Sequence, residues 1–444
     1  MVSQRTSIAG TGYVGLCTGV GLASKGFKVI VSTHDPEKAN SINQGVPPFY
    51  EPSLEEMLKI AVREGNLRCV IEREQAVLDT EITFIAVGTP SLPDGSINLD
   101  YIETASREIG KALAKKEQYH VVVVKSTVIP GTSQNVVKPL LEKHSQKRCG
   151  ANFGLCMSPE FLREGSAMHD TLHPDRIVIG EHDKRSGDTL QDLFKSFHGN
   201  ETPPIIRTTL PTAEIIKYAN NSFLATKISF INQIAKICQK TPNTDIVAVA
   251  KAIGLDHRIN PKFLNAGLGY GGSCFPKDVK ALIAFSKSLG YAPNLLEAVE
   301  EVNQKQPYEA VELARGFFKS LKGKKVAILG LSFKPETDDM REAVSIKIIS
   351  KLLEEGAKII AYDPVAMPNT RNIFGDKIAY APSATQGIKN TDCCMVVTEW
   401  TEFRKLTPED FASNMQNPIV IDGRRIYDPE LFINKIKYSA IGLG

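Results

Sequence analysis

The sequence lacks the features that mark membrane, secreted and zinc-binding proteins. No apolar run approaches the roughly 18 residues of a membrane span, and a glycine loop begins already at Gly10, which leaves no room for a signal peptide. The eight cysteines are scattered along the chain and form no C-x-x-C pair. We therefore expect a cytoplasmic protein with free thiols, without a metal site and without membrane association.

A concentration of positive charge is also absent. The net charge is +3 over 444 residues, and lysine and arginine form no block. This distribution argues against nucleic acid as a partner, whereas a small anionic ligand remains compatible. The chain is longer than single hydrophobic cores usually grow, so we expect two or three domains.

Short β-branched runs alternate with helical patterns in the first and the last part of the chain. Examples are residues 28–32, 82–87 and 120–125 near the start, and residues 325–330 and 358–363 near the end. Apolar strands separated by helices predict a parallel sheet that is covered on both faces. We therefore expect an α/β protein with two doubly wound, Rossmann-like domains.

The middle of the chain has a helical pattern instead. A stretch without proline or glycine lies between Pro211 and Pro242. Its apolar residues recur at helical spacing: Ile215, Tyr218, Phe223, Ile228, Ile231, Ile234 and Ile237. We expect one helix of about thirty residues that opens an all-helical segment and serves as a dimer spine. The predicted domains are residues 1–205, the central helical segment 206–305, and residues 306–444.

The loop Gly10-Thr11-Gly12-Tyr13-Val14-Gly15 follows a predicted strand and opens a predicted helix. In that context the G-x-G-x-x-G pattern predicts a dinucleotide site, because the glycines permit a tight turn and the helix N-terminus presents N–H groups to a pyrophosphate. A plain structural turn is the alternative. About twenty residues further on, an acidic residue should accept hydrogen bonds from the ribose. Asp35 stands there, either in this role or as a turn residue before Pro36, while Thr33 ends the strand. NAD is the favoured cofactor, although a threonine does not repel a 2′-phosphate.

The stretch GYGGSCFPKD places Cys274 among glycines, with Lys277 and Asp278 close behind. A cysteine in such a setting is either a catalytic nucleophile or a buried small hydrophobic residue. Lys217 and Asn221 are spaced i, i+4 on the long helix, so they either stabilise an oxyanion together or belong to a solvated face. In SPEFLREG, the carboxylates of Glu160 and Glu164 either act as base and binding group or begin a helix.

Together these motifs resemble the UDP-glucose/GDP-mannose dehydrogenase family over essentially the whole length. The resemblance rests on GTGYVG, NQGVPPFYEP, VGTP, KST, SPEFLREGSA, KYANNSFLATKISFIN, FLNAGLGYGGSCFPKD, GLSFKP, TDDMR and DGR. It implies that the enzyme oxidises the C6 alcohol of UDP-glucose to a carboxylate, with two NAD and one water, through a thiohemiacetal and a thioester on Cys274. It also implies that residues 1–205 bind NAD and that residues 306–444 bind the UDP-sugar.

The resemblance further implies roles for individual residues. Cys274 would be the nucleophile, Lys217 and Asn221 the oxyanion donors, Asp278 a partner of Lys217 in proton transfer, and Thr127 and Glu160 the groups that position or activate water. The implied cofactor-binding residues are Gly10, Gly12, Tyr13, Val14, Gly15, Thr33, Lys38, Val87, Gly88, Thr89, Thr127, Glu164, Lys277 and Arg341. The implied substrate-binding residues are Glu160, Phe161, Leu162, Arg163, Glu164, Lys217, Asn221, Arg258, Phe263, Leu264, Asn265, Ala266, Gly267, Gly269, Tyr270, Gly271, Phe333, Lys334 and Arg424. Arg258 would reach into a neighbouring subunit, which implies a homodimer or a higher homo-oligomer. Thr33 departs from the family, which usually has aspartate there.

Three other functions compete with this prediction. A sister dehydrogenase would act on a UDP-N-acetylhexosamine or GDP-mannose. A two-electron hydroxyacid dehydrogenase would also pair a Rossmann domain with a long helix, but it would need neither Cys274 nor a second α/β domain. A non-catalytic nucleotide-sugar sensor would not need a thiol, a lysine and an aspartate together.

Overall fold

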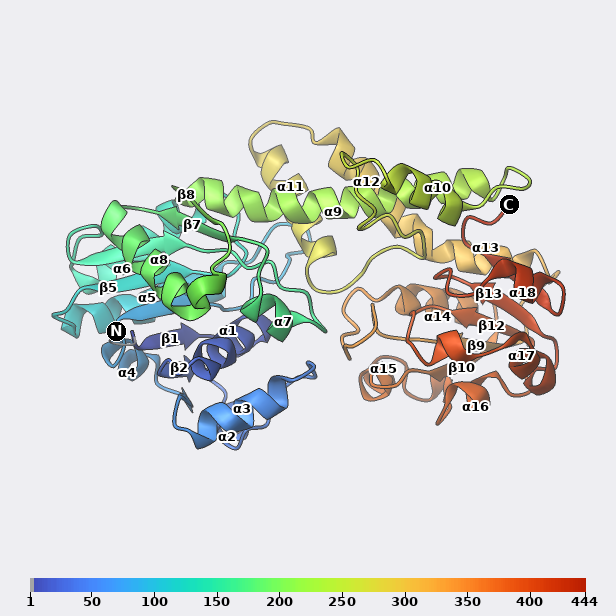
Figure 1. Ribbon diagram of the computed structural model, residues 1–444, viewed down its shortest axis with the longest axis horizontal. Helices are drawn as coiled ribbons and strands as arrows, with labels where there is room; N and C mark the ends of the chain where they lie inside the picture. Colours follow the sequence, from blue (N-terminus) through green and yellow to red (C-terminus); the bar gives the residue numbers. More distant parts are fainter. Residues whose placement is uncertain (1–3) are drawn as a thin grey trace. The chain divides into compact units, whose positions relative to one another are not determined.

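The computed structural model describes residues 4–444, which form two compact units (Figure 1). Unit 1 ends at Asn220, and unit 2 comprises Asn221–Gly444. Helix α9, Leu210–Cys238, is continuous through the boundary between them. No helix among residues 4–444 is long and apolar enough to cross a membrane.

Unit 1 is an eight-stranded sheet with helices between its strands. The strands are β1 (Thr6–Ala9), β2 (Val29–Ser32), β3 (Leu67–Val70), β4 (Ile82–Ile85), β5 (His120–Val124), β6 (Phe153–Met157), β7 (Ile177–Glu181) and β8 (Ile205–Thr209). The helices are α1 (Tyr13–Ser24), α2 (Pro36–Asn43), α3 (Leu54–Arg63), α4 (Arg73–Leu78), α5 (Asp100–Lys115), α6 (Lys138–Ser145), α7 (Ala167–Leu172) and α8 (Lys184–His198). The strand order is β3-β2-β1-β4-β5-β6-β7-β8.

The expected parallel sheet is confirmed for most of unit 1, but β7 pairs antiparallel with β6. A parallel neighbour requires a crossover connection that returns the chain to the start of the preceding strand. Between β6 and β7 the only helix is the short α7, which packs against α1. The chain therefore enters β7 from the end of the sheet at which it left β6.

Alternate residues of the strands in unit 1 face opposite layers of helices. Val121 and Val123 belong to a core that includes residues of α1, α3 and α8. Val122 and Val124 belong to a second core with residues of α5 and α6. Because successive side chains of a strand point to opposite faces, an uninterrupted valine run is buried on both sides. The doubly wound fold of the first part is thus confirmed.

Unit 2 contains a second sheet, which has six strands and is parallel throughout. The strands are β9 (Lys325–Leu329), β10 (Lys358–Tyr362), β11 (Ala379–Tyr380), β12 (Cys393–Val396), β13 (Ile419–Asp422) and β14 (Lys437–Ala440), in the order β11-β10-β9-β12-β13-β14. The helices that accompany this sheet are α14 (Val344–Glu354), α15 (Met367–Phe374), α16 (Ala384–Ile388), α17 (Pro408–Asn414) and α18 (Pro429–Ile433).

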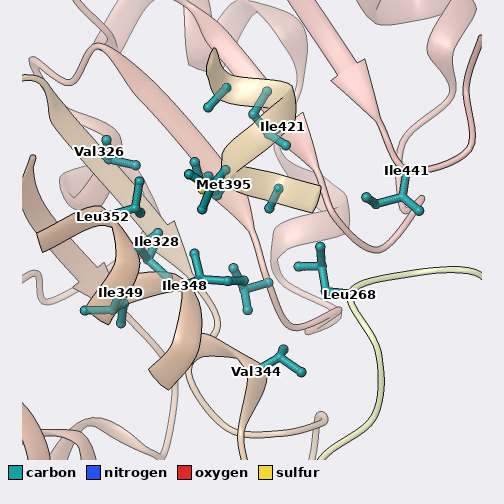
Figure 2. Packing of buried hydrophobic residues seen from close by; sticks show 14 of the residues in the cluster. Leu268, Val326, Ile328, Val344, Ile348, Ile349, Leu352, Met395, Ile421 and Ile441 are labelled. Carbon is teal, nitrogen blue, oxygen red and sulfur yellow. The ribbon is translucent and has the colours of Figure 1, made fainter. Parts of the chain in front are cut away.

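The two faces of this sheet are also both covered. Met395 packs in a core with residues of α14, while Cys394 packs on the other face with residues of α16, α17 and α18. Figure 2 shows part of the first core, including Val344 and Ile348 from α14. Leu268, which precedes the GYGGSC stretch, belongs to the same cluster and is completely buried (Figure 2). The loop before Cys274 is therefore anchored in the hydrophobic core of unit 2.

The helical segment contains the long helix that the sequence predicts. Helix α9 has 29 residues, and it is followed by α10 (Ile246–Gly254), α11 (Phe275–Ser288), α12 (Asn294–Lys305) and α13 (Glu309–Arg315). Helix α11 begins at Phe275, and Pro276 occupies its first turn, where a missing N–H is tolerated. The division of the chain into three domains remains a prediction.

Candidate active site

In unit 1 the predicted site residues follow the carboxyl ends of neighbouring strands. Gly10 follows β1, Thr33 follows β2, Val87 lies just beyond β4, Thr127 lies just beyond β5, and Glu160 lies just beyond β6. In the order β2-β1-β4-β5-β6 these strands are adjacent. Ligands of open α/β sheets bind at this end, where the strand order reverses, and here the reversal lies between β1 and β4.

The glycine loop has the geometry of a dinucleotide cradle. Gly10 has φ +122°, and a Cβ there would lie 2.3 Å from the carbonyl oxygen of Ala86. Gly12 is the N-cap of α1, where no side chain caps the helix and a Cβ would meet nothing within 4 Å. The N-terminus of α1 is thus free of a side-chain cap and open beside Gly12, as binding of a pyrophosphate to its N–H groups requires. The plain structural turn is the weaker interpretation.

Neighbouring loops enclose this cradle. The ring of Tyr13 stacks on Phe49 with 3.9 Å between centroids, and its hydroxyl donates to the carbonyl of Tyr50 over 3.1 Å. The hydroxyl of Thr89 donates to the carbonyl of Thr127 over 2.9 Å, which joins the loops after β4 and β5. Val87 is half-buried and Gly88 is exposed. A bound dinucleotide would thus meet loops that are already ordered.

Glu160 and Lys217 form a buried ion pair. The Nζ of Lys217 donates to Oε1 of Glu160 over 2.9 Å, and their side chains are 3% and 6% exposed, respectively. The other carboxylate oxygen accepts from the amide of Leu162, and Lys217 lies 5.5 Å from the centroid of the Phe161 ring. Two charges are removed from water only where such hydrogen bonds satisfy them. The interpretation of Lys217 as part of a solvated face is therefore wrong.

Another lysine of unit 1, Lys125, is buried close to an aromatic ring. Lys125 is 9% exposed, and its ammonium lies 5.9 Å from the ring centroid of Phe84. Burial lowers its pKa to about 8, although the charge of Glu160 opposes this shift and that of Lys217 adds to it. The sequence analysis did not single out Lys125. Its only signal was its place in the KST motif.

The other acidic and basic groups of the SPEFLREG segment differ in setting. Glu164 is buried, with 9% of its surface exposed. Arg163 is 61% exposed and pairs with Asp170, to which its Nη2 donates over 2.6 Å. Neither residue begins a helix, since α7 starts at Ala167. Their predicted contacts with cofactor and sugar remain predictions.

In unit 2, Cys274 stands apart from the other cysteines. It is half-buried and forms the N-cap of α11, while the other cysteines are all buried. Burial raises the pKa of the Cys69, Cys149 and Cys156 thiols to about 12. A helix N-terminus favours negative charge, so the position of Cys274 suits a thiolate. The interpretation of this residue as a buried core cysteine is wrong.

Asp278 lies one turn further along α11 and is completely buried. Its two carboxylate oxygens accept hydrogen bonds from Nδ2 of Asn221 over 2.7 Å and from Nζ of Lys277 over 2.6 Å. Asn221 is only 3% exposed, so it does not belong to a solvated face either. Unit 2 therefore assembles Cys274, Asp278, Lys277 and Asn221 on the first turn of α11 and on α9.

Buried amides hold the loop that precedes Cys274. Asn303 accepts from the amide of Tyr270 over 2.8 Å and donates to its carbonyl over 3.0 Å. Gln306 donates to the carbonyl of Gly267 over 2.7 Å, and Asn232 accepts from the amide of the same glycine over 2.8 Å. The sequence analysis assigned no role to these three residues. Asn232 could have been noticed as an amide among the apolar residues of α9.

The remaining predicted substrate residues of unit 2 fall into two groups. Some form the loop or contact it: Phe263, Leu264, Asn265, Ala266, Gly267, Gly269, Tyr270, Gly271, Phe333 and Arg424. The Nζ of Lys334 lies 5.8 Å from the centroid of the Phe333 ring. A Cβ at Gly272 would lie 2.7 Å from the Phe333 ring, and Nη1 of Arg424 donates to the carbonyl of Gly269 over 3.2 Å. Arg258, in contrast, is 78% exposed and pairs with Asp256. Arg341, which was predicted to contact the cofactor, pairs with Asp339, and its carbonyl accepts from the amide of Gly272 over 2.9 Å. The proposed contacts of these two arginines remain predictions.

Directly after the first strand of the second sheet, two backbone N–H groups donate to a carboxylate of the chain. The carboxylate of Asp363 accepts from the amides of Leu331 and Ser332 over 2.8 and 3.2 Å, and from Nε1 of Trp400 over 3.1 Å. These two N–H groups directly follow β9, as Thr11 and Gly12 directly follow β1 in unit 1. A carboxylate of the chain already satisfies them. Within residues 4–444, no group of three His, Cys, Asp or Glu side chains is arranged to hold a metal ion.

Comparison with known proteins matches one family along the chain. Residues 4–198, 211–305 and 327–429 match, respectively, the NAD binding, central and UDP binding domains of the UDP-glucose/GDP-mannose dehydrogenase family. The chain is 46% identical to UDP-glucose 6-dehydrogenase AglM of Haloferax volcanii, covering 95% of this chain and 96% of that protein. It is 40% identical to UDP-glucose 6-dehydrogenase TuaD of Bacillus subtilis, covering 96% and 90%.

A solved structure supports the same relationship. The UDP-glucose dehydrogenase of Pyrobaculum islandicum superimposes with a TM-score of 0.92 at 38% identity, covering 99% of this chain and 98% of that one. The similarity thus extends over both α/β sheets and the helical segment.

Proposed function

Because the chain belongs to the UDP-glucose/GDP-mannose dehydrogenase family and is an NAD-dependent dehydrogenase, we propose that it oxidises UDP-glucose to UDP-glucuronate in a four-electron reaction. One observation carries the assignment of the chemistry. Cys274 alone among the cysteines is accessible, and it stands at a helix N-terminus one turn from a buried carboxylate. NAD, when bound to unit 1, accepts the hydride of each oxidation step.

The residues of the chain then handle the proton, the thiol and the water. Loss of a hydride and a proton from the C6 alcohol gives an aldehyde, and the Cys274 thiolate adds to it to form a thiohemiacetal. The ammonium of Lys217 and the amide of Asn221, one turn apart on α9, stabilise the oxyanion. A second hydride loss gives a thioester. Water then attacks its carbonyl carbon, with Glu160 as the base and Thr127 as a positioning group, and releases carboxylate and thiol.

The buried partners of these groups support their roles. Asp278 accepts from Asn221 and thereby orients the amide, and its pair with Lys277 keeps a fully buried carboxylate compensated. The ion pair of Glu160 with Lys217 keeps both side chains in defined positions. Asp278 and Lys217 together handle the proton that the alcohol releases.

The stoichiometry of NADH tests this function. With limiting UDP-glucose and excess NAD, about two NADH should form per sugar, because two hydrides leave C6. One NADH per sugar would indicate a two-electron dehydrogenase, and none would reject UDP-glucose as the substrate. The same assay with GDP-mannose and UDP-N-acetylhexosamines tests the sister activities. Faster turnover of one of these nucleotide sugars than of UDP-glucose would identify that sugar as the substrate, and the enzyme would then be a sister dehydrogenase of the same family.

We also propose that the enzyme works as a homodimer through helix α9. Phe223, Phe230 and Ile237 are spaced by seven residues on this helix and are 65%, 49% and 58% exposed. A heptad stripe of large apolar side chains is typical of a helix that packs against another helix. A second copy of the same stripe provides a self-complementary partner.

The free cysteines fit a reducing compartment, and we propose that the enzyme is located in the cytoplasm.

A further inference from the structure

The end of β2 carries an unusual residue for an NAD site. Thr33 follows the last residue of the strand, and its amide donates to the carbonyl of Val70 over 3.1 Å. In Rossmann folds an acidic side chain at this point accepts a hydrogen bond from the 2′-hydroxyl of the adenosine ribose. The Thr33 side chain is uncharged, and its hydroxyl oxygen accepts from the amide of Asp35 over 3.3 Å. Among residues 4–444 its hydroxyl proton has no acceptor, so it is available to a ligand.

The nearest carboxylate in the sequence is already engaged. Asp35 is the N-cap of α2, and its Oδ1 accepts from the amides of Glu37 and Lys38 over 3.0 and 3.1 Å. Its Oδ2 lies 3.5 Å from Nζ of Lys38. The hydrogen bond from the Lys38 amide lowers the pKa of Asp35, so the carboxylate stays ionised as a cap. Asp35 therefore acts as the turn residue that the sequence allowed, and its carboxylate is held by the start of α2.

The surrounding charges do not oppose a phosphate. His34 and Lys38 are 59% and 52% exposed at this end of β2. Glu108 lies 3.5 Å from Nε2 of His34, but it also pairs with the buried guanidinium of Arg73 at the start of α4. Asp35 and Glu108 are thus balanced by Lys38 and Arg73, and His34 adds positive charge when it is protonated. A carboxylate at the position of Thr33 would make the same region negative.

We propose that unit 1 binds NADP(H) as well as NAD(H), with affinities that differ by less than tenfold. The hydroxyl of Thr33 donates to the 2′-phosphate, and Lys38 supplies positive charge beside it. A carboxylate would both accept from a 2′-hydroxyl and repel a 2′-phosphate, so its absence removes the basis of discrimination. The inference goes beyond NAD as the cofactor and rests on the dinucleotide site, not on the identity of the sugar.

Equilibrium binding to the full-length protein without sugar tests the proposal. Titration calorimetry with NADH and with NADPH should give dissociation constants within tenfold of each other. In Thr33→Asp, the dissociation constant of NADPH should rise at least tenfold, about 1.4 kcal/mol, while that of NADH changes less than threefold. Thr33→Ser, which keeps the hydroxyl, is the matched control and should retain the wild-type ratio.

Salt provides a second measurement. Raising the ionic strength should weaken NADPH binding more than NADH binding, because exposed cations that attract the phosphate are screened. Lys38→Gln should reduce this difference. The proposal is overturned if wild-type protein binds NADPH more than tenfold more weakly than NADH, or if Thr33→Asp leaves the ratio unchanged. Failure to bind NADH would refute the dinucleotide site itself, whereas lack of turnover with UDP-glucose would refute only the proposed substrate.

Discussion

The backbone around Cys274 gives this thiol a setting that no other cysteine of the chain has. It ends a glycine-rich loop and begins α11, so the thiol is partly accessible at the positive end of a helix. Cys393 and Cys394, by comparison, lie in a central strand and are completely buried on its two faces. The same residue type therefore serves packing in the sheets and chemistry at the helix start.

Replacing this thiol tests its role. Cys274→Ser should reduce the steady-state formation of NADH from UDP-glucose by at least about 10³-fold, because a serine hydroxyl is a much weaker nucleophile at neutral pH. Binding of UDP-glucose, measured by calorimetry, should change less than threefold. Cys149→Ser, at a buried position outside the site, is the control for loss of a thiol. Unimpaired turnover in Cys274→Ser would exclude the covalent mechanism.

Lys125 offers a prediction about pH. Its pKa is about 8 in the folded protein and near 10.5 when unfolded. Between these values the unfolded chain binds more protons, so this group makes the free energy of unfolding rise with pH. The group contributes no slope below about pH 8, where both states are protonated. Lys125→Met removes the contribution entirely.

The measurement compares the two proteins at two pH values. From pH 7.5 to pH 10, the stability of Lys125→Met relative to wild type should fall by about 2 kcal/mol, as determined from urea unfolding. The comparison cancels the titration of buried cysteines and tyrosines, which is common to both proteins. A relative stability that does not change over this range would mean that Lys125 titrates normally in the folded state.

Helix α9 has one apolar face that packs within the chain and another apolar face that is exposed. Tyr218, Ala225 and Ile231 are completely buried, whereas Phe223 and Phe230 are exposed. The sequence placed all the large apolar residues of this stretch in one helical pattern. It could not separate the face that packs within the chain from the face that remains open, because both faces are apolar and their spacing is compatible with one helix.

Charges on the open face should disrupt a dimer. The double variant Phe223→Lys, Phe230→Lys should raise the dissociation constant of the dimer at least about 100-fold, since apolar burial is lost and like charges meet at a symmetric interface. Sedimentation velocity over a concentration series measures this constant. Leu431→Lys, at an exposed position on α18, is the control and should leave the oligomeric state unchanged. A double variant with the wild-type oligomeric state would place the interface elsewhere.

The two sheets of the molecule are both doubly wound, but the loops that follow their first strands, β1 and β9, differ. In unit 1 the glycine loop is open at Gly12 and leads directly into α1. In unit 2 the first amides after β9 donate to the carboxylate of Asp363, and α14 begins only at Val344. This difference agrees with the family match, in which the first part is the NAD binding domain and the last part the UDP binding domain.

Hydrogen exchange should separate the two ligands along the chain. NADH should slow amide exchange in the glycine loop and at the start of α1, because the pyrophosphate accepts hydrogen bonds from these N–H groups. UDP should slow exchange within residues 327–429 and leave the glycine loop unchanged. Mass spectrometry of peptic fragments measures both effects. Protection of the glycine loop by UDP alone would contradict this division of roles.

The sequence by itself determined the α/β alternation, the glycine loop, the long helix and the shortlist that contains Cys274. These features depend on hydrophobic periodicity and on local backbone requirements, and both can be recognised from residues that are close together in the sequence. The antiparallel β7 was not predicted, since strand direction depends on where a connecting segment packs.

Only the tertiary structure decided which groups are buried and what they bind. It made Asp35 a helix cap, paired Glu160 with Lys217, and used Asn303 and Gln306 to hold the loop before Cys274. It also left Phe223 and Phe230 exposed on α9. The physical reason is that burial and hydrogen bonding join residues far apart in the sequence, so no local pattern contains them.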